Sequence, residues 1–271
     1  MKKIKSNQKL IKYFVITIAF LIIASMIGGL VSLIITIFNI SAYKNNQVHE
    51  IYQSNTISAT LDIDLQTADL EIKLGDNLSV ETDSKYVSCN QEDKRIVVKE
   101  KKHLSLKKKD EYKIIITIPR ELMFDIVDIE TDAGKIYLEE LQTKRLNLKL
   151  GAGVSTINNL VVTDKAKIDG GASKFVINNG TINNLSFDMG VGETIINAGI
   201  LGNSDIFAEI GKLEVNLNGT INDYSISVSK GIGSIKFNEE NLKNDTIIGN
   251  GNNYLTINGG VGSIKITTQY Q

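Results

Sequence analysis

The sequence predicts an all-β fold: a single-stranded β-solenoid, or β-helix-like repeat domain, with an N-terminal transmembrane helix. Two observations support this prediction. No charged residue occurs in the 31 positions from Tyr13 to Tyr43. In most of the second half, apolar and polar residues alternate around glycines that recur at intervals of 19 to 29 residues. A repeat of this kind has to be recognised before any single motif within it is interpreted.

The first 40 residues carry a membrane signal. Residues 1–12 form a basic tail with five lysines, and residues 13–40 are apolar over a length sufficient for a helix that spans hydrocarbon. Because the lysines lie mainly before this segment, the positive-inside rule places the tail in the cytoplasm. The sequence thus predicts a single-pass cell-membrane protein with residues 44–271 extracytoplasmic, joined to the span by a linker at residues 41–55.

Residues 56–125 are interpreted as an N-terminal β segment that caps the repeats. With Ala68 at a corner, the flanking apolar residues fall on the apolar positions of the repeat. The register is then lost until residue 125, where strand-like stretches are joined by polar loops. Pro119 ends the last of them, as expected of a residue that cannot donate to a strand ladder.

Residues 126–268 form the β-solenoid itself, with about seven repeats. Counted from the recurring glycine, 25 of the 28 positions at offsets −7, −5, +2 and +4 are apolar, although only 42% of the chain is hydrophobic. A spacing of two predicts strands, and repeats of about 20 residues without helices predict turns that bury a shared interior. Residues 238–253 interrupt the pattern and are expected to bulge out as a loop or a partial turn.

The recurring glycines are predicted to be structural corners. Apolar positions change parity at each of them, so one residue turns the chain, and glycine suits a bend because it lacks Cβ. The phosphate-loop interpretation of GGVGSIKI at residues 259–266 is rejected, because the motif recurs and no helix follows it. The corner residues are Gly134, Gly153, Gly192, Gly211, Gly233 and Gly262, with Ser173 in the equivalent slot of the third repeat.

A second recurring residue follows each trailing strand. Asparagine closes turns with its own side chain, and stacked amides at one corner could form a hydrogen-bonded ladder. The predicted ladder consists of Asn158, Asn178, Asn197, Asn216 and Asn238. A ligand-binding asparagine row is the alternative interpretation of the same residues.

The sequence offers little reactive chemistry, and we predict no enzyme activity, no cofactor and no metal. The single Cys89 and the two histidines have no triad or metal-ligand context. Asp169 and Asp188 could mark a calcium or glycan site, but two acids are few for calcium. The strongest charge feature is the loop KEKKHLSLKKK, a candidate contact for an anionic polymer through Lys101, Lys102, Lys107, Lys108 and Lys109.

Several segments together resemble a known bacterial family. They are LDIDLQTADLEIKLGDNLSVET, YKIIITIPREL, and the units DIETDAGKIYL, GAGVSTINNL, GVGETIINAG and GIGSIKF. This pattern, over residues 55–268, resembles the β-strand-repeat family of unknown function labelled "putative adhesin". The resemblance implies an extracytoplasmic β-solenoid, often membrane-anchored and sometimes encoded beside envelope-stress regulators. It implies no catalytic residues, and Ser173 departs from the glycine pattern.

The function predicted from these observations is adhesin-like binding or scaffolding at the cell envelope by a membrane-anchored protein. The predicted partners are the membrane, which it crosses once, and a cell-wall polymer or another envelope protein; nucleic acid is not expected. An accessory or regulatory role in an envelope-stress response is one alternative. A wall-polysaccharide hydrolase or lyase is another, although no reactive cluster is visible for it.

Overall fold

The computed structural model describes residues 48–54, 59–101 and 112–269. The chain divides into two units, residues 1–45 and 46–271, and the described residues belong to the second. They form one 17-stranded sheet and one short 3-10 turn. The elements are β1 (His49–Ser54), β2 (Thr60–Leu65), β3 (Asp69–Gly75), β4 (Leu78–Thr82), β5 (Val87–Glu92), β6 (Arg95–Glu100), β7 (Lys113–Pro119), β8 (Phe124–Asp169), β9 (Ala172–Ile177), β10 (Gly180–Asn183), β11 (Leu185–Asp188), β12 (Val191–Leu201), β13 (Asn203–Leu217), η1 (Ile221–Asp223), β14 (Tyr224–Phe237), β15 (Glu240–Asn241), β16 (Thr246–Gly249) and β17 (Asn253–Thr268).

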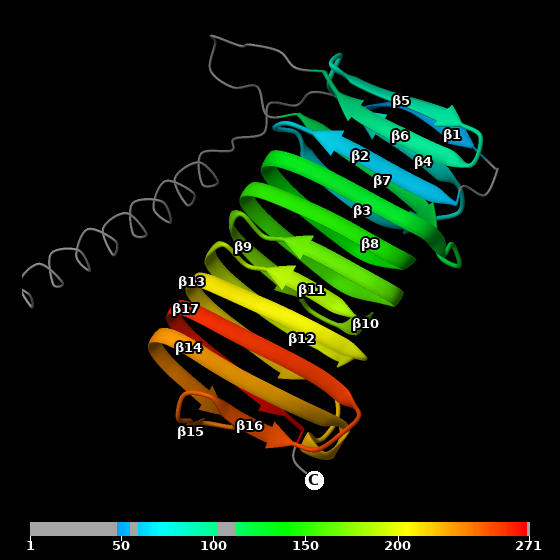
Figure 1. Ribbon diagram of the computed structural model, residues 1–271. Coiled ribbons are helices and arrows are strands. Elements are labelled where there is room, and N and C mark those ends of the chain that lie inside the picture. The colour runs from blue at the N-terminus through cyan, green and yellow to red at the C-terminus, as the bar shows by residue number, and fades with distance from the viewer. Residues whose placement is uncertain (1–47, 55–58, 102–111, 270–271) are drawn as a thin grey trace, which may run out of the picture. The chain divides into compact units, whose positions relative to one another are not determined.

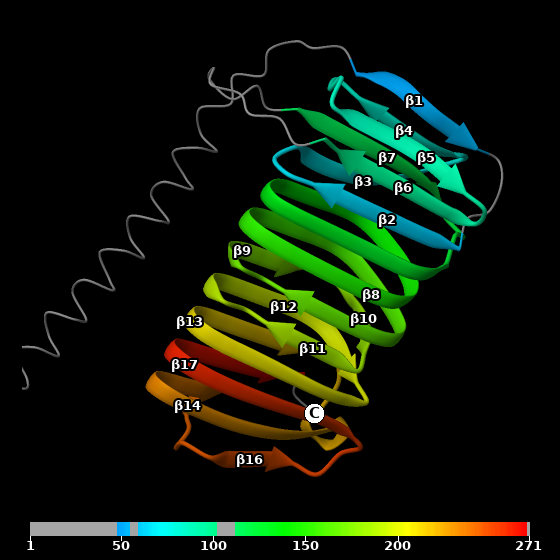
Figure 2. The same ribbon diagram turned by 45° about the horizontal axis from the view of Figure 1, so that its top comes forward.

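Successive repeats lie side by side as parallel strands in register (Figures 1 and 2). Gly192 of β12 pairs with Gly211 of β13, and Thr194 pairs with Leu213. We call the strand positions before each corner glycine the leading side and those after it the trailing side. Because side chains alternate along a strand, every second residue on both sides points into the same interior.

The interior is filled by the apolar positions of the repeat. Five residues before each corner, the side chains are at most 2% exposed: Ile129, Leu148, Ile168, Phe187, Ile206, Val228 and Ile257. The equivalent residues on the trailing side, such as Ile196 and Val215, are fully buried. Each such side chain contributes about 1.5–3 kcal/mol to stability. Because these side chains contact one another from repeat to repeat, they hold neighbouring repeats together.

The strand order at the C-terminal part of the sheet departs from the order in the chain. β17, drawn in red in Figures 1 and 2, lies between β13 and β14. It pairs in parallel with β13 from Asn203↔Tyr254 to Leu217↔Thr268, and with β14 from Tyr224↔Asn253 to Phe237↔Ile266. The segment expected to bulge out as a loop or a partial turn contains β15 and β16, which pair antiparallel with β14 on the side away from β17.

The N-terminal part shows a similar departure. β2 and β3 pair directly with β8 on one side and with β6 and β7 on the other. Beyond these strands, β4 pairs antiparallel with β7, β1 with β4, and β5 with β6. Thus the first repeat, residues 60–75, joins the stack ahead of the strands that separate it from β8 in the sequence.

The predicted fold class is therefore corrected. The described residues are all-β, but they do not form a single-stranded β-solenoid, because antiparallel strands complete the sheet at both ends and β17 is inserted between earlier strands. The alternation that predicted the repeats is nearly the same in each of them, so it fixes the register between neighbouring repeats without specifying which repeats are neighbours.

The prediction of a transmembrane helix and of a single-pass membrane localisation is also corrected. In the part of the chain that the structure describes, no helix is long and apolar enough to cross a bilayer. The predicted basic tail, the predicted span and most of the linker lie outside the described residues. A long apolar run is compatible with a membrane-spanning helix but does not by itself establish one. The structure therefore gives no support for an anchored protein with residues 44–271 outside the cytoplasm.

Candidate binding surface

The corner glycines pack against the backbone of the neighbouring repeat in the sheet. Five of the six have positive φ between +136° and +149°: Gly134, Gly192, Gly211, Gly233 and Gly262. Gly153 does not, but a Cβ built on it would lie 2.0 Å from the carbonyl oxygen of Gly134. Ser173 occupies the same slot with its hydroxyl donating to the Gly170 carbonyl at 2.6 Å. These residues form close-packed backbone, which leaves no room there for a ligand.

The asparagines of the predicted ladder lie on the trailing side. The first four lie in adjacent repeats, but Thr267 of β17 separates Asn216 from Asn238. Asn178 Nδ2 donates to Asn158 Oδ1 at 2.8 Å, and Asn216 Nδ2 donates to Asn197 Oδ1 at 2.7 Å. Between these two pairs, Asn197 donates instead to the backbone carbonyl of Ile177 at 3.2 Å. Asn238, at a φ of +44°, accepts a bond from the Thr268 amide at 3.0 Å. Their amides are thus largely engaged within the protein.

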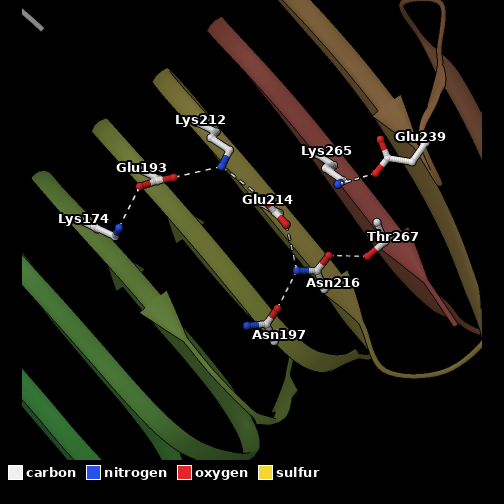
Figure 3. Close-up of polar contacts among 9 residues, drawn as sticks. All are labelled: Lys174, Glu193, Asn197, Lys212, Glu214, Asn216, Glu239, Lys265 and Thr267. Carbon is white, nitrogen blue, oxygen red and sulfur yellow. Dashed lines mark hydrogen bonds and ion pairs between the residues drawn. The ribbon is translucent and has the colours of Figure 1, made fainter. Parts of the chain in front are cut away.

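Charged residues beside the asparagines are also tied to one another (Figure 3). Glu193 accepts from Lys174 at 3.2 Å and from Lys212 at 3.1 Å, and Lys212 also reaches Glu214 at 3.3 Å. Partial burial acts to raise the pKa of Glu193, but the bonds from Lys212 and Lys174 outweigh it and lower that pKa. Its bonds to Glu193 and Glu214 raise the pKa of Lys212. This network holds three neighbouring strands of the trailing side together.

The acids singled out in the sequence have local roles on the leading side. Asp169 Oδ1 accepts from the Gly171 amide at 3.3 Å, and Asp188 Oδ1 accepts from the Gly190 amide at 3.1 Å. Both close the turn into the corner, as aspartate commonly does. Among the described residues, no three His, Cys, Asp or Glu side chains group closely enough to hold a metal ion.

The remaining reactive and basic candidates are placed as follows. Burial raises the pKa of the Cys89 thiol to about 12, so the thiolate, which is the nucleophilic form, is scarce at neutral pH. Lys101 is exposed at the end of β6. Lys102, Lys107, Lys108 and Lys109 lie outside the described residues, and an anionic-polymer contact through them stays a prediction.

A different group of side chains stands out on the leading side near the C-terminal part of the sheet. Phe207 is 49% exposed and Tyr254 is 55% exposed, on the adjacent strands β13 and β17. With their neighbours they make what we call the aromatic face: Asn203, Asp205 and Phe207 of β13, and Tyr254, Thr256 and Asn258 of β17. Register pairs these residues directly across the two strands, Asn203 with Tyr254, Asp205 with Thr256 and Phe207 with Asn258.

The polar groups of the aromatic face are mostly unengaged. Within the described residues, the side chains of Asn203, Asp205 and Thr256 make no hydrogen bond or ion pair. Only Asn258 is occupied, accepting from the Ser229 hydroxyl at 2.8 Å. This contrasts with the trailing side, where the amides and charges are bonded to one another, and it marks the aromatic face as the surface with free capacity for a ligand.

The sequence interpretation missed both aromatic residues, although a signal was present. The offset four before the corner holds Glu130, Lys149, Asp169 and Asp188 in successive repeats, and Phe207 is the next residue in that outward series. An aromatic residue at an outward position that is otherwise charged is a candidate for binding. Tyr254 likewise stands at an outward offset of its own repeat.

A structural residue was missed as well. Glu100 of β6 is only 5% exposed. Its Oε2 accepts from the backbone amides of Gln66, Thr67 and Ala68 at 2.8, 2.9 and 3.2 Å. It therefore caps the corner of the first repeat, which has Ala68 in place of glycine. Because this bond spans more than 30 residues, local patterning gave no indication of it.

Comparisons with known proteins add names rather than a site. No protein-family model and no curated protein matches the chain. The matching solved structures include a "putative adhesin" from Parabacteroides merdae (11% identity, 83% of this chain and 98% of the other, TM-score 0.42). Another is a "putative adhesin" from Bacteroides fragilis (13%, 82% and 98%, TM-score 0.41). A third is a "putative lipid binding protein" from Parabacteroides distasonis (16%, 83% and 96%, TM-score 0.34). The adhesin label agrees with the family that the sequence resembles, and at these scores the likeness carries no argument about a ligand.

Proposed function

We propose that this chain is an adhesin-like binding protein that holds an extended ligand along the outer leading side of its sheet, without chemical conversion of that ligand. One observation carries the proposal: the aromatic face combines exposed rings with polar groups that have no partner among the described residues. The constant separation of about 4.8 Å between neighbouring strands spaces the contacts on such a face regularly. Repeat proteins commonly bind through surfaces of this kind.

The test compares two serines on the same strand. Ser227 of β14 is an exposed leading-side residue beside Thr256, and Ser234 of β14 is an exposed trailing-side residue. The full chain is screened by pull-down against immobilised polysaccharides and surface proteins, and bound material is analysed for conversion. Ser227→Arg should abolish retention of any ligand found, because it places a long charged side chain on the leading side, whereas Ser234→Arg should retain it.

Two outcomes would contradict the proposal. The first is the absence of adhesin-like binding, seen either as no saturable retention of any ligand in the screen or as chemical conversion of a retained ligand. The second is equal retention by both arginine variants, which would show that the leading side is not the contact surface. Circular dichroism and thermal unfolding of both variants verify that each folds.

A further inference from the structure

We infer that the aromatic face is a binding site for a neutral polysaccharide, with Phe207 and Tyr254 as stacking platforms. The inference rests on the proposed function and names its ligand class. The C–H faces of a sugar ring pack against an aromatic ring, whose electron-rich face attracts them. The hydroxyl groups of the sugar need hydrogen-bond partners at the side of that ring, and these are present between the two aromatics.

The geometry suits a chain rather than a single sugar. Tyr254 lies opposite Asn203, four residues before Phe207 on β13. With a rise of about 3.3 Å per residue and about 4.8 Å between strands, the two aromatic positions are about 14 Å apart. Asp205 and Thr256, paired with each other, lie between them. A ligand that touches both rings must therefore cross these two polar side chains, which is what an oligosaccharide of several units would do.

The charge around the site favours a neutral ligand. On one side, Ser186 and Asp188 of β11 pair with Asp205 and Phe207. On the other, Ser225, Ser227 and Ser229 of β14 pair with Tyr254, Thr256 and Asn258. The aromatic face and these flanking positions contain two aspartates and no lysine or arginine. Carboxylates at this site would repel wall polymers and lipid headgroups that carry negative charge.

The apolar groups are also too dispersed for a typical protein interface. Ile247 of β16, 73% exposed, faces the same way because it pairs with Ser227. Serine and threonine separate it from the two aromatics, so the three do not form one continuous patch. Protein interfaces usually have a contiguous apolar centre with a polar rim. Here the two aromatic rings are separated by hydroxyl, amide and carboxylate groups. This arrangement suits a sugar polymer, which presents apolar faces of its sugar rings next to hydroxyl groups at their edges.

The test uses the full chain in affinity gel electrophoresis with three neutral polymers, a β-glucan, a mannan and soluble chitin oligosaccharides, and with anionic polygalacturonate. We expect at least one neutral polymer to retard the chain, and high salt to leave that effect unchanged because no ion pair is involved. Phe207→Ala and Tyr254→Ala should each weaken binding about tenfold. Tyr254→Phe should bind normally, since it keeps the ring. Tyr137→Ala, an exposed aromatic of the trailing side, is the matched control and should bind as the parent chain does.

The outcomes separate this inference from the proposed function. Binding of only polygalacturonate, or binding that is lost in high salt, would overturn the neutral-ligand assignment and point to the lysines near residue 105 instead. Neutral-polymer binding that Ser227→Arg removes but that both alanine variants retain would overturn the stacking role while leaving the proposed function intact. Because both aromatic side chains are about half exposed, the alanine variants should lower the unfolding temperature without preventing folding, and circular dichroism verifies that both fold.

Discussion

At the scale of single residues, a backbone oxygen of the neighbouring repeat decides which residue each corner accepts. A Cβ on Gly192 would lie 1.9 Å from the carbonyl oxygen of Ser173, and Gly192 has a φ of +147°. Both conditions disfavour any other residue. The parity change in the sequence located this bend, but the steric reason at Gly153, which lacks the unusual φ, depends on how closely turns stack and is invisible in a sequence.

Gly192→Val should lower the free energy of unfolding by about 3 kcal/mol or more, because it adds backbone strain and a steric clash. Its neighbour Val191, half-buried at the same corner, provides the control. Val191→Ala should cost about 1 kcal/mol, from the apolar area it no longer covers. Chemical denaturation of both variants measures the difference, and equal midpoints would contradict the assignment of this corner.

At the scale of elements, the trailing side stabilises itself through its charged residues. Glu193 joins β12 to β9 and β13 through Lys174 and Lys212. Because the pKa of Glu193 is lowered in the folded state, its contribution is present at neutral pH and is lost as the pH falls through that lowered pKa. The network should therefore stabilise the fold at pH values above the ordinary pKa range of glutamate, and this stabilisation should be lost in strong acid.

Glu193→Gln should lower the unfolding temperature at pH 7 by about 1–3 °C and leave it nearly unchanged in strong acid. Glu209→Gln is the control, since Glu209 is an exposed acid of β13 for which the structure gives no ion pair among the described residues. Differential scanning calorimetry across this pH range measures both. A Glu193→Gln effect that is equally large in strong acid would assign the loss to packing rather than to charge.

The sequence predicted the register between paired strands better than it predicted the order of the strands in the sheet. Gly211, Gly233 and Gly262 head repeats with the same apolar positions, so each can pair in register with either of the others. In the structure β14 lies outside β17, and it is joined to the rest of the chain through η1, β15 and β16, short elements that have no distinctive pattern of their own. For the binding surface the same alternation marked Phe207 as outward, but it could not show that Tyr254, 47 residues later, would lie on the neighbouring strand.

At the scale of the described unit, β17 is an interior strand although it follows every other strand in the sequence. It is hydrogen-bonded to β13 along one edge and to β14 along the other. β16, by contrast, pairs with β14 alone, and Ile247 is 73% exposed there. Amides of a strand that is covered on both edges open only with the surrounding structure.

Native-state hydrogen exchange should show this difference. We expect the amides of residues 255–266 to exchange as slowly as those of residues 204–217, and the amides of residues 246–249 to exchange faster. Mass spectrometry of peptic peptides resolves these segments, and residues 191–198 of β12 serve as the interior reference. Fast exchange throughout residues 253–268 would show that β17 lies at an edge and would overturn the strand order.

The insertion of β17 has a consequence for biosynthesis. The ribosome delivers β14 before β17, and during that interval β13 and β14 both present open edges whose glycines are matched. If these two strands pair with each other in that interval, the later segment has to displace that pairing to reach its own place. A slowing of translation between β16 and β17 would lengthen the life of that wrong pairing, and exposed strand edges in nascent chains are where aggregation begins.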